Sequence, residues 1–218
     1  MQALVTGAAK RIGRAIALEL KHRGARVAMH YRNTPPQDAE IVVQGDQALE
    51  PERIVREAIE KLGGLDLLVC NAAEFEKAPA AELSPERFEA MLAANLTGPF
   101  RLMQAAYPHL KAAHGSIVTL LDVCGTSQVW KGYAHYAASK AGLAALTRLL
   151  ALEWAPEVRV NGVAPGAIDT GDERLLKRIP LGRIGTAQDV ARAVVFLAEQ
   201  PFITGQILTV DGGRTVNP

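Results

Sequence analysis

"TGAAKRIGRAIA", residues 6–17, follows the short apolar run "ALV" and opens a segment with helical periodicity. A strand, a glycine turn and a helix in this order are typical of a site for the pyrophosphate of a dinucleotide. Glycine permits close approach of a ligand, and the helix N-terminus offers free N–H groups. Only Gly7 and Gly13 are present, with the basic pair Lys10 and Arg11 between them. A purely structural strand-to-helix turn is the alternative interpretation.

The alternation of apolar runs and helical patterns continues along the whole chain. Strands are expected near residues 2–6, 26–31, 40–44, 66–70, 116–121, 158–163 and 206–210. Helices are expected near residues 11–23, 51–62, 84–113 (broken around Gly98-Pro99), 134–154 and 186–199. Continuous apolar strands are buried on both faces, and their alternation with helices indicates a parallel sheet. We therefore expect one α/β domain over residues 1–218, a Rossmann-type doubly wound parallel sheet of about seven strands with helices on both faces.

Composition excludes several classes of protein. The formal net charge of +1 gives no broad basic field for nucleic acid. No apolar run reaches the ~18 residues that span a bilayer, and "MQALVTG" enters a strand pattern without a signal peptide, so a cytoplasmic location is expected. Cys70 and Cys124 are expected to be buried free thiols. The five histidines show no metal-ligand spacing, so no metal is expected.

The connection between the second and third strands is short. Residues 33–40 contain the polar, proline-rich "NTPPQD", whereas a parallel crossover normally takes a dozen or more residues and usually a helix. Extended residues over this span reach at most ~28 Å. Either the crossover helix is absent, or a mobile segment is missing from the printed sequence.

The end of the second strand bears on cofactor choice. It reads "MHYRN", with His30, Tyr31 and Arg32 and no carboxylate, whereas an NAD site usually has an acidic residue there. The fork of an arginine suits a 2′-phosphate, and Lys10 and Arg11 would add to the same positive pocket. The pattern predicts NADP(H) rather than NAD(H), with solvated surface charges as the alternative.

A tyrosine and a lysine form a second candidate site. "HYAASKAGL", residues 135–143, places Tyr136 and Lys140 one helical turn apart. A nearby ammonium stabilises a phenolate and lowers the tyrosine pKa from ~10. Such a tyrosine delivers a proton to a carbonyl or imine while hydride arrives from nicotinamide. The pair alone is a weak signal, because it is common on exposed helices.

Further motifs strengthen that signal. With "TGAAKRIG", "CNAA" (70–73), "AANLTG" (93–98), "RVNGVAPG" (159–166) and "ITGQILTVDGG" (203–213), the chain resembles the short-chain dehydrogenase/reductase family from residue 2 to about 213. The resemblance implies that Tyr136 is the catalytic acid/base, that Lys140 lowers its pKa and holds the nicotinamide ribose, and that Asn95 supports a water-linked proton relay. Turn and resemblance together imply cofactor binding by Gly7, Arg11, Ile12, Gly13, His30, Tyr31, Arg32, Asp46, Asn71, Ala72, Lys140, Pro165, Gly166 and Ile168.

One departure from the family pattern is informative. The family's catalytic serine is replaced in "TLLDVCG" by Asp122, which resembles the pteridine reductase branch, as do "TGAAKRIGRAIA" and "HYR". In that branch an arginine at the position of Arg11 reaches the pterin and the cofactor phosphates. A phenylalanine at the position of Phe75 stacks on the pterin, and Asp122 and Tyr136 supply the proton. The alternatives are that Asp122 caps the turn after the strand and that Phe75 only packs at the pocket edge.

Three functions follow as hypotheses. The first is NADPH-dependent reduction of a pterin or dihydrofolate-type substrate at a site of Arg11, Phe75, Asp122 and Tyr136. The second is reduction of a 3-oxoacyl thioester on acyl carrier protein, or of another carbonyl, which would predict serine at position 122 and a basic docking patch. The third is a non-catalytic NADPH-binding protein, against which Tyr136, Lys140 and Asn95 argue.

Two expectations concern assembly and access. The family usually forms tetramers through the helix that contains the catalytic tyrosine, and the alanines of residues 134–151 permit close helix approach. We therefore expect a homotetramer that binds a small-molecule substrate and neither nucleic acid nor membrane. Residues 169–180, "DTGDERLLKRIP", are expected to close over the substrate.

Overall fold

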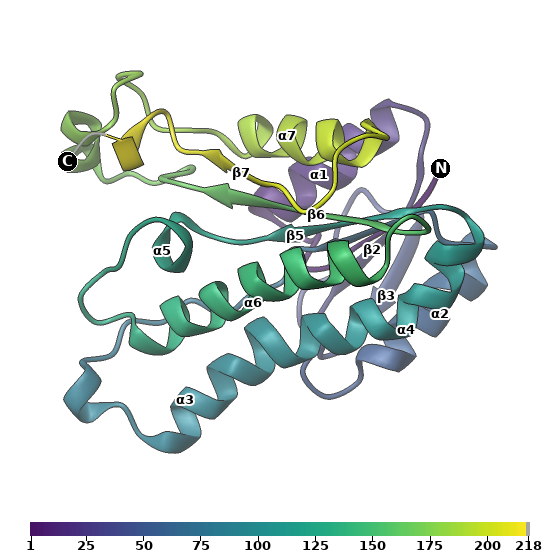
Figure 1. Cartoon of the computed structure of the whole chain (residues 1–218), viewed down its shortest axis with the longest axis horizontal. Helices are drawn as coiled ribbons and strands as arrows, with labels where there is room; N and C mark the ends of the chain where they lie inside the picture. Colours follow the sequence, from purple (N-terminus) through teal and green to yellow (C-terminus); the bar gives the residue numbers. More distant parts are fainter. Residues whose placement is uncertain (217–218) are drawn as a thin grey trace.

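A single sheet of seven parallel strands forms the centre of the molecule, in the order β3-β2-β1-β4-β5-β6-β7 (Figure 1). The computed structural model describes residues 1–216. The strands are β1 (Gln2–Val5), β2 (Arg26–Tyr31), β3 (Ile41–Gln44), β4 (Leu67–Cys70), β5 (Ser116–Leu120), β6 (Arg159–Pro165) and β7 (Ile207–Val210). The predicted fold class, a doubly wound parallel α/β sheet, is confirmed.

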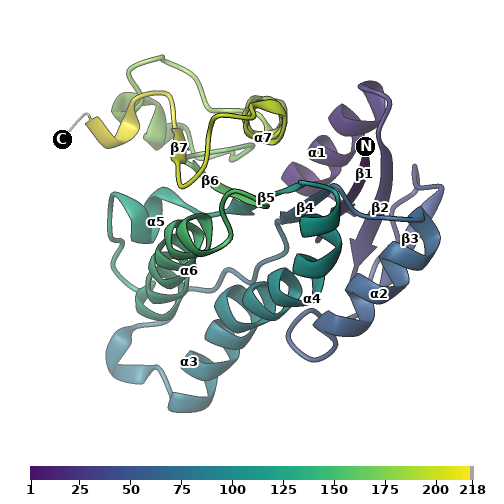
Figure 2. The same cartoon turned by 45° about the vertical axis from the view of Figure 1, so that its right-hand side comes forward.

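Helices cover both faces of this sheet (Figure 2). The α-helices are α1 (Arg11–His22), α2 (Pro51–Leu62), α3 (Pro85–Leu92), α4 (Gly98–Ala112), α5 (Val123–Thr126), α6 (Ala134–Glu153) and α7 (Ala187–Glu199). One face is covered by α2, α4 and α6, and the other by α1 and α7. Short 3-10 helices lie at Ala80–Glu82, Glu173–Arg178 and Arg214–Val216.

The strand residues divide between two hydrophobic cores. In β4, Leu68 packs with α2 and α4 on one face, whereas Leu67 and Val69 pack with α1 and α7 on the other. All three side chains are fully buried, and burying one such side chain contributes about 1.5–3 kcal/mol. A one-residue slip would exchange the two faces, so packing fixes the register and brings the carboxyl ends of all strands to one edge.

The short crossover between β2 and β3 has no helix. Residues 32–40 run as an irregular segment, and β3 still pairs with β2 in parallel register from Ala28↔Ile41 to Tyr31↔Gln44. Two side chains of α1 hold the segment: Arg14 Nε donates to Asp38 Oδ2 at 2.9 Å, and Lys21 Nζ donates to the Asp38 carbonyl at 2.7 Å. The printed sequence therefore crosses from β2 to β3 without a helix, and the possibility of a missing segment stays as stated above.

The long helical segment departs from expectation at one point. A break around Gly98-Pro99 was expected, but the chain stays helical there, and a π-helical turn at Ala93–Thr97 joins α3 to α4. Pro99 lies in the first turn of α4, where its missing N–H breaks no necessary bond. The irregularity therefore falls one turn earlier than predicted and contains Asn95; π-helical turns are frequent at functional sites.

Two further expectations concern the cysteines and the membrane. Cys70 and Cys124 are buried and free, as predicted. Burial raises the pKa of the Cys70 thiol to about 12 and that of Cys124 to about 11, so neither is a ready thiolate. Within residues 1–216, no helix is both long enough and apolar enough to cross a bilayer.

Candidate active site

A cleft of about 990 Å³ runs along the carboxyl ends of the strands, where open α/β sheets bind ligands. It begins at the β1–α1 turn and the end of β2, and it continues to Tyr136 and Lys140 on α6. The loop after β6 closes it on the far side through Thr170, Asp172 and Leu175. Of the residues predicted from the sequence for this site, all except Asn95 line the cleft. Their individual roles stay predictions.

Close contacts shape the glycine turn. Gly7 has a φ of +63°, and a Cβ on Gly13 would collide with the Gly7 carbonyl and the Asn71 side chain. Asn71 Nδ2 donates to the Thr6 carbonyl at 2.8 Å, and Thr6 Oγ1 accepts from the backbone N–H groups of Asn71 at 2.9 Å and Ala72 at 3.0 Å. Asn71 and Ala72 thus brace the turn.

The N-terminus of α1 fits a bound anion. Lys10 occupies the N-cap position in extended conformation without a side-chain cap bond, and the first turn of the helix contains no acidic residue. The first N–H groups of a helix lack intrahelical partners, and the positive end of the dipole favours negative charge. The turn therefore fits the pyrophosphate of a dinucleotide.

Arg11 adopts a backbone conformation that favours glycine. Its φ is +52°, in the left-handed region, and its side chain is exposed beside the cleft. A non-glycine residue held in that region costs on the order of 1–3 kcal/mol. The turn therefore stores strain at the position where a glycine would have none.

His30, a predicted cofactor-binding residue at the end of β2, is held as a neutral ring. The ring is buried, its Nδ1 accepts from the Gly7 N–H at 3.2 Å, and its Nε2 lies 3.0 Å from the Gly45 carbonyl. Accepting at one nitrogen and donating at the other requires the neutral ring. Burial lowers the pKa of His30 as well. Its role here is to join the glycine turn to the end of β3.

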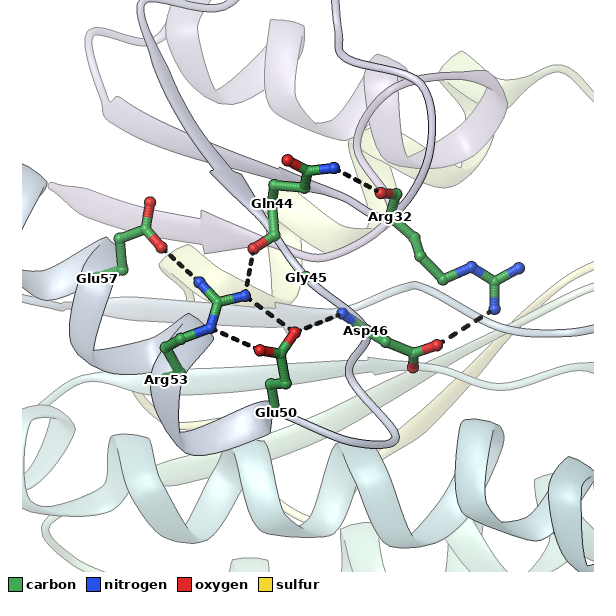
Figure 3. A pocket seen from close by; sticks show the side chains of 7 residues that line it. All are labelled: Arg32, Gln44, Gly45, Asp46, Glu50, Arg53 and Glu57. Atoms are coloured by element: carbon green, nitrogen blue, oxygen red, sulfur yellow. Dashed lines mark hydrogen bonds and ion pairs between the residues drawn. The ribbon is translucent and has the colours of Figure 1, made fainter.

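Arg32 provides a cation at the edge of the cleft. Its guanidinium, about half exposed, pairs with Glu74 at 2.7 Å and with Asp46 at 3.7 Å. Figure 3 shows the adjoining hollow of about 410 Å³, in which Arg53 is bound by Glu50, Glu57 and the Gln44 carbonyl. Arg53 is therefore satisfied within the protein, whereas Arg32 faces the cleft with exposed carboxylates as its partners.

Asp122 and Tyr136 are in direct contact. The Tyr136 hydroxyl donates to Asp122 Oδ2 at 2.9 Å, and Asp122 Oδ1 accepts from the Cys124 backbone N–H at 2.7 Å. Asp122 is also the N-cap residue of α5. Asp122 therefore fulfils both roles considered from the sequence. One carboxylate oxygen caps the turn after the strand, and the other accepts a hydrogen bond from the Tyr136 phenol.

The direction of the pKa shift at Tyr136 differs from expectation. Burial raises the pKa of Tyr136, and the charge and hydrogen bond of Asp122 raise it further. Burial raises the Asp122 pKa as well, and it lowers the Lys140 pKa to about 8. Lys140 Nζ donates to the Leu120 carbonyl at 2.8 Å and lies 5.8 Å from the centre of the Tyr136 ring. The Tyr136 pKa is thus raised in this arrangement, not lowered by Lys140 as expected, and Asp122 contributes to the rise after burial.

Asn95 lies behind the cleft, in the π-helical turn. The buried side chain accepts from the Glu74 N–H at 2.8 Å and donates to the Glu74 carbonyl at 2.8 Å. It thereby fixes the segment that leads to Phe75. A relay between Asn95 and Lys140 stays a prediction, because their side chains form no direct hydrogen bond within the described chain.

An aromatic cluster borders the Asp122–Tyr136 pair. Phe75 stacks on Tyr133 with ring centres 4.9 Å apart and meets Tyr136 edge-on at 4.8 Å. The Phe75 side chain is nevertheless 58% exposed, which is more than a packing role needs. Trp130 lies edge-on to Tyr133 at 5.8 Å. Sequence reasoning missed Trp130 and Tyr133, although "WKGYAHY" places both at three-residue intervals before Tyr136.

Two polar residues of the site were also missed. Gln47 Nε2 donates to the carbonyls of Ala72 and Ala94, both at 2.8 Å, and so ties β4 to the π-helical turn. Arg214 reaches the cleft from the C-terminal 3-10 helix. Gln47 follows Asp46 without a recognisable pattern. Arg214 comes directly after "VDGG", and its position there was the available signal.

A nucleotide-type cleft that ends at a tyrosine–lysine pair defines a class of oxidoreductases, and comparison with known proteins agrees. The family model described as Enoyl-(Acyl carrier protein) reductase matches residues 7–215. A tropinone reductase homologue of Arabidopsis thaliana is 37% identical over 99% of this chain and 92% of the relative. The 3-oxoacyl-[acyl-carrier-protein] reductase FabG of Thermotoga maritima is 34% identical over 98% and 97%.

A solved structure gives the same assignment. The short-chain dehydrogenase/reductase of the glucose/ribitol dehydrogenase type from Brucella melitensis superimposes with a TM-score of 0.86 at 33% identity, covering 97% of this chain and 95% of that one. The chain belongs to the short-chain dehydrogenase/reductase family and is an oxidoreductase. Members of this family use NAD(H) or NADP(H).

Proposed function

We propose that this protein is an NADPH-dependent reductase of a pterin or dihydrofolate-type substrate, with Tyr136 and Asp122 as the proton donors. The observation that supports this most strongly is the 2.9 Å hydrogen bond between the Tyr136 hydroxyl and Asp122 Oδ2. A carboxyl group in that place differs from the hydroxyl of the family's usual serine because it exchanges a proton.

Reduction of a C=N bond needs such an exchange. Bound nicotinamide supplies the hydride to carbon, and the ring nitrogen must then gain a proton. A phenol joined to a carboxyl group delivers that proton through one short bond, and general acid catalysis of this kind is worth roughly 10²–10⁴-fold. The raised pKa of Asp122 supports the proposal, because it keeps part of the carboxyl population protonated at a higher pH.

The aromatic cluster suits a flat heterocycle. Phe75 and Tyr133 stack nearly parallel, with planes inclined by 20°, beside Tyr136. An aromatic face contributes about 0.5–1.5 kcal/mol beyond burial, and it orients a ring for reaction. Arg11, an exposed residue that lines the same cleft, is available to the cofactor phosphates and the substrate.

NADPH is the proposed cofactor because Arg32 directly follows β2 and lines the same cleft as Lys10 and Arg11. A 2′-phosphate would replace the exposed carboxylates Asp46 and Glu74 as the partner of Arg32. Arg32→Asp should raise KM for NADPH at least tenfold more than KM for NADH. Arg192→Asp, at an exposed position of α7, is the matched charge reversal and should change neither. Equal effects of Arg32→Asp on both cofactors would contradict the assignment.

The substrate is tested by NADPH oxidation, followed by absorbance, with dihydrobiopterin, dihydrofolate and an acetoacetyl thioester. Wild type and Asp122→Ser are compared, because serine restores the family's usual residue and also caps a helix well. Turnover of the pterins, with most of the rate lost in Asp122→Ser, is the expected result. Turnover of the thioester alone would overturn the pteridine assignment.

Carbonyl reduction is the second candidate, favoured by relatives named as 3-oxoacyl-[acyl-carrier-protein] reductases. This candidate predicts a basic patch that docks an acyl carrier protein. Two of its basic residues are already paired with carboxylates, since Arg101 pairs with Glu52 and Lys111 pairs with Glu157. Carbonyl activity gained by Asp122→Ser without loss of pterin turnover would favour this candidate.

A homotetramer formed through α6 is part of the proposal. Leu149 and Leu152 of that helix are 47% and 78% exposed, which would suit a contact between subunits. Light scattering with Leu152→Glu tests it: wild type should have the mass of a tetramer, and the variant a smaller mass.

A further inference from the structure

Arg214 reaches the cleft from a rigid C-terminal turn. Gly212 and Gly213 have φ values of +66° and +87°, and the Asp211 carboxylate accepts from the N–H groups of Gly213 at 2.9 Å and Thr215 at 2.7 Å. This turn directs the side chain into the same cavity as Tyr136 and Asp122. The position of Arg214 is therefore built by its own segment and is not a chance placement of a surface side chain.

The guanidinium of Arg214 has no anionic partner in the described chain. The residue is only 6% exposed, and the ion pairs found among residues 1–216 do not include it. Its Nε is buried without a hydrogen-bond acceptor. Arginine stays charged at any relevant pH, and a buried charge is normally paired. The charges of Asp122 and Arg214 influence each other, but no carboxylate of residues 1–216 lies within ion-pairing distance of the guanidinium.

A second orphaned donor lies beside it. The Arg214 guanidinium carbon lies 5.4 Å from the centre of the Trp130 ring, and Trp130 Nε1 is also buried without a partner among residues 1–216. Both groups can only donate hydrogen bonds. Two unpaired donors at one wall of a cavity favour a ligand group that accepts several bonds, and a carboxylate does so in the planar geometry of the arginine fork.

The carboxylates that line the cleft nearby are already engaged. Asp122 meets Tyr136 and the Cys124 N–H, Asp172 binds Arg174 at 2.7 and 2.9 Å, and Asp169 accepts from the Ala187 N–H at 3.1 Å. None of them needs to turn toward Arg214. Arg214 therefore lacks a direct carboxylate partner among residues 1–216, and its fork is available to a ligand.

We propose that Arg214 binds a carboxylate of the substrate and so selects anionic substrates at the active site. The inference rests on the oxidoreductase site proposed above and narrows its substrate class. The unsaturated part of the substrate lies against Phe75 and Tyr133, where Tyr136 delivers the proton, while the carboxylate lies at Arg214 and Trp130. Arg214 is then a specificity-determining residue, and it takes no part in the proton transfer.

Binding of matched probe pairs, measured by titration calorimetry on the full chain, tests the proposal. The pairs are pterin-6-carboxylate with 6-methylpterin, and 4-acetylbenzoate with its methyl ester, so that both candidate functions are covered. We expect at least one carboxylate to bind tenfold or more tightly than its neutral partner. Arg214→Gln should abolish this preference, and Arg214→Lys should keep part of it. Arg192→Gln, which removes an exposed arginine of α7 outside the cleft lining, should keep it whole.

The proposal is overturned if wild type prefers neither carboxylate, or if the preference survives in Arg214→Gln. It is also overturned if Arg214→Gln weakens neutral and anionic probes equally and shifts the pH profile of kcat. That result would make Arg214 a positioning residue that acts through Asp122. Where a probe turns over, KM for the carboxylate should rise at least tenfold in Arg214→Gln with kcat within about twofold. Failure of every substrate to oxidise NADPH would contradict the proposed function, while the binding preference would still decide the role of Arg214.

Discussion

The hydroxyl of Tyr136 donates a 2.9 Å hydrogen bond to Oδ2 of Asp122, which lies between β5 and α5. The contact places a carboxyl group where it both shares the phenol's proton and, through Oδ1, caps α5. These two functions are separable by substitution, because an amide still caps a helix but does not exchange a proton.

Asp122→Asn should therefore lower the turnover of a C=N substrate at least tenfold with little change in stability. Asparagine is as good an N-cap as aspartate, so the free energy of unfolding should stay within about 0.5 kcal/mol. Asp122→Ala should lose about 1 kcal/mol as well as the activity. Steady-state kinetics and urea unfolding measure the two effects. Full activity in Asp122→Asn would show that the carboxylate only caps the turn.

The backbone of Arg11 gives a second prediction. With φ at +52°, Arg11→Gly should raise the free energy of unfolding by about 1 kcal/mol, since glycine adopts this conformation without strain. The same change should raise KM for NADPH, because a cation beside the cleft is lost. Lys10→Gly is the matched control, since Lys10 has an extended φ of −154° and its replacement should stabilise nothing. A lower free energy of unfolding in Arg11→Gly than in wild type would show that the Arg11 backbone is not strained.

His30 should make the protein sensitive to mild acid. Burial lowers the pKa of the folded-state imidazole below its ordinary value, so below pH ~6.5 the unfolded chain binds a proton that the folded chain resists. The free energy of unfolding should therefore fall as pH decreases from 7 toward 5. The fall should be smaller in His30→Gln, which has an amide acceptor and donor but no titration in this range. Parallel curves for the two proteins would exclude His30 as the titrating group.

Lys140 should have an effect of the same sign at alkaline pH, where stability should again rise with pH. Burial lowers its pKa to about 8, so between pH ~8 and ~10.4 the unfolded chain holds a proton that the folded chain has released. The free energy of unfolding of wild type should rise across this interval relative to that of Lys140→Met, by up to about 3 kcal/mol. Chemical denaturation at four pH values measures the difference. A constant difference would mean that Lys140 keeps its ordinary pKa.

The fold was predictable because periodicity and burial determine it. The apolar runs of β1 and β4 and the glycine turn before α1 have clear sequence patterns. The apolar run of β5 and the helical pattern of α6 do as well, and these two elements place Tyr136 near Asp122. The neutral state of His30 had no such pattern, since its partners are the backbone groups of Gly7 and Gly45. The side chain of Arg214 was missed because an irregular turn and a 3-10 helix position it, and neither has a periodic signal.

The direction of the Tyr136 pKa shift was mispredicted for a related reason. The four-residue spacing shows that Lys140 lies one turn from the tyrosine, but it does not show which acceptor the ammonium chooses. In the structure that acceptor is the Leu120 carbonyl. The Asp122 carboxylate, fourteen residues away in sequence, is closer to the phenol and has the larger effect. Sequence spacing alone does not rank competing electrostatic neighbours.

The direct connection between β2 and β3 has a consequence for how the chain folds. Closing a loop of half the length costs about 0.6 kcal/mol less entropy, so this parallel pair becomes a comparatively local contact that forms without a docked helix. The position of Arg32 at this sheet edge then depends on the short segment of residues 32–40 and on the hydrogen bonds of Arg14 and Lys21 to Asp38. Evolutionary change in length at this connection would alter the rate of assembly and the edge that presents Arg32 together, while leaving the contact between Asp122 and Tyr136 untouched.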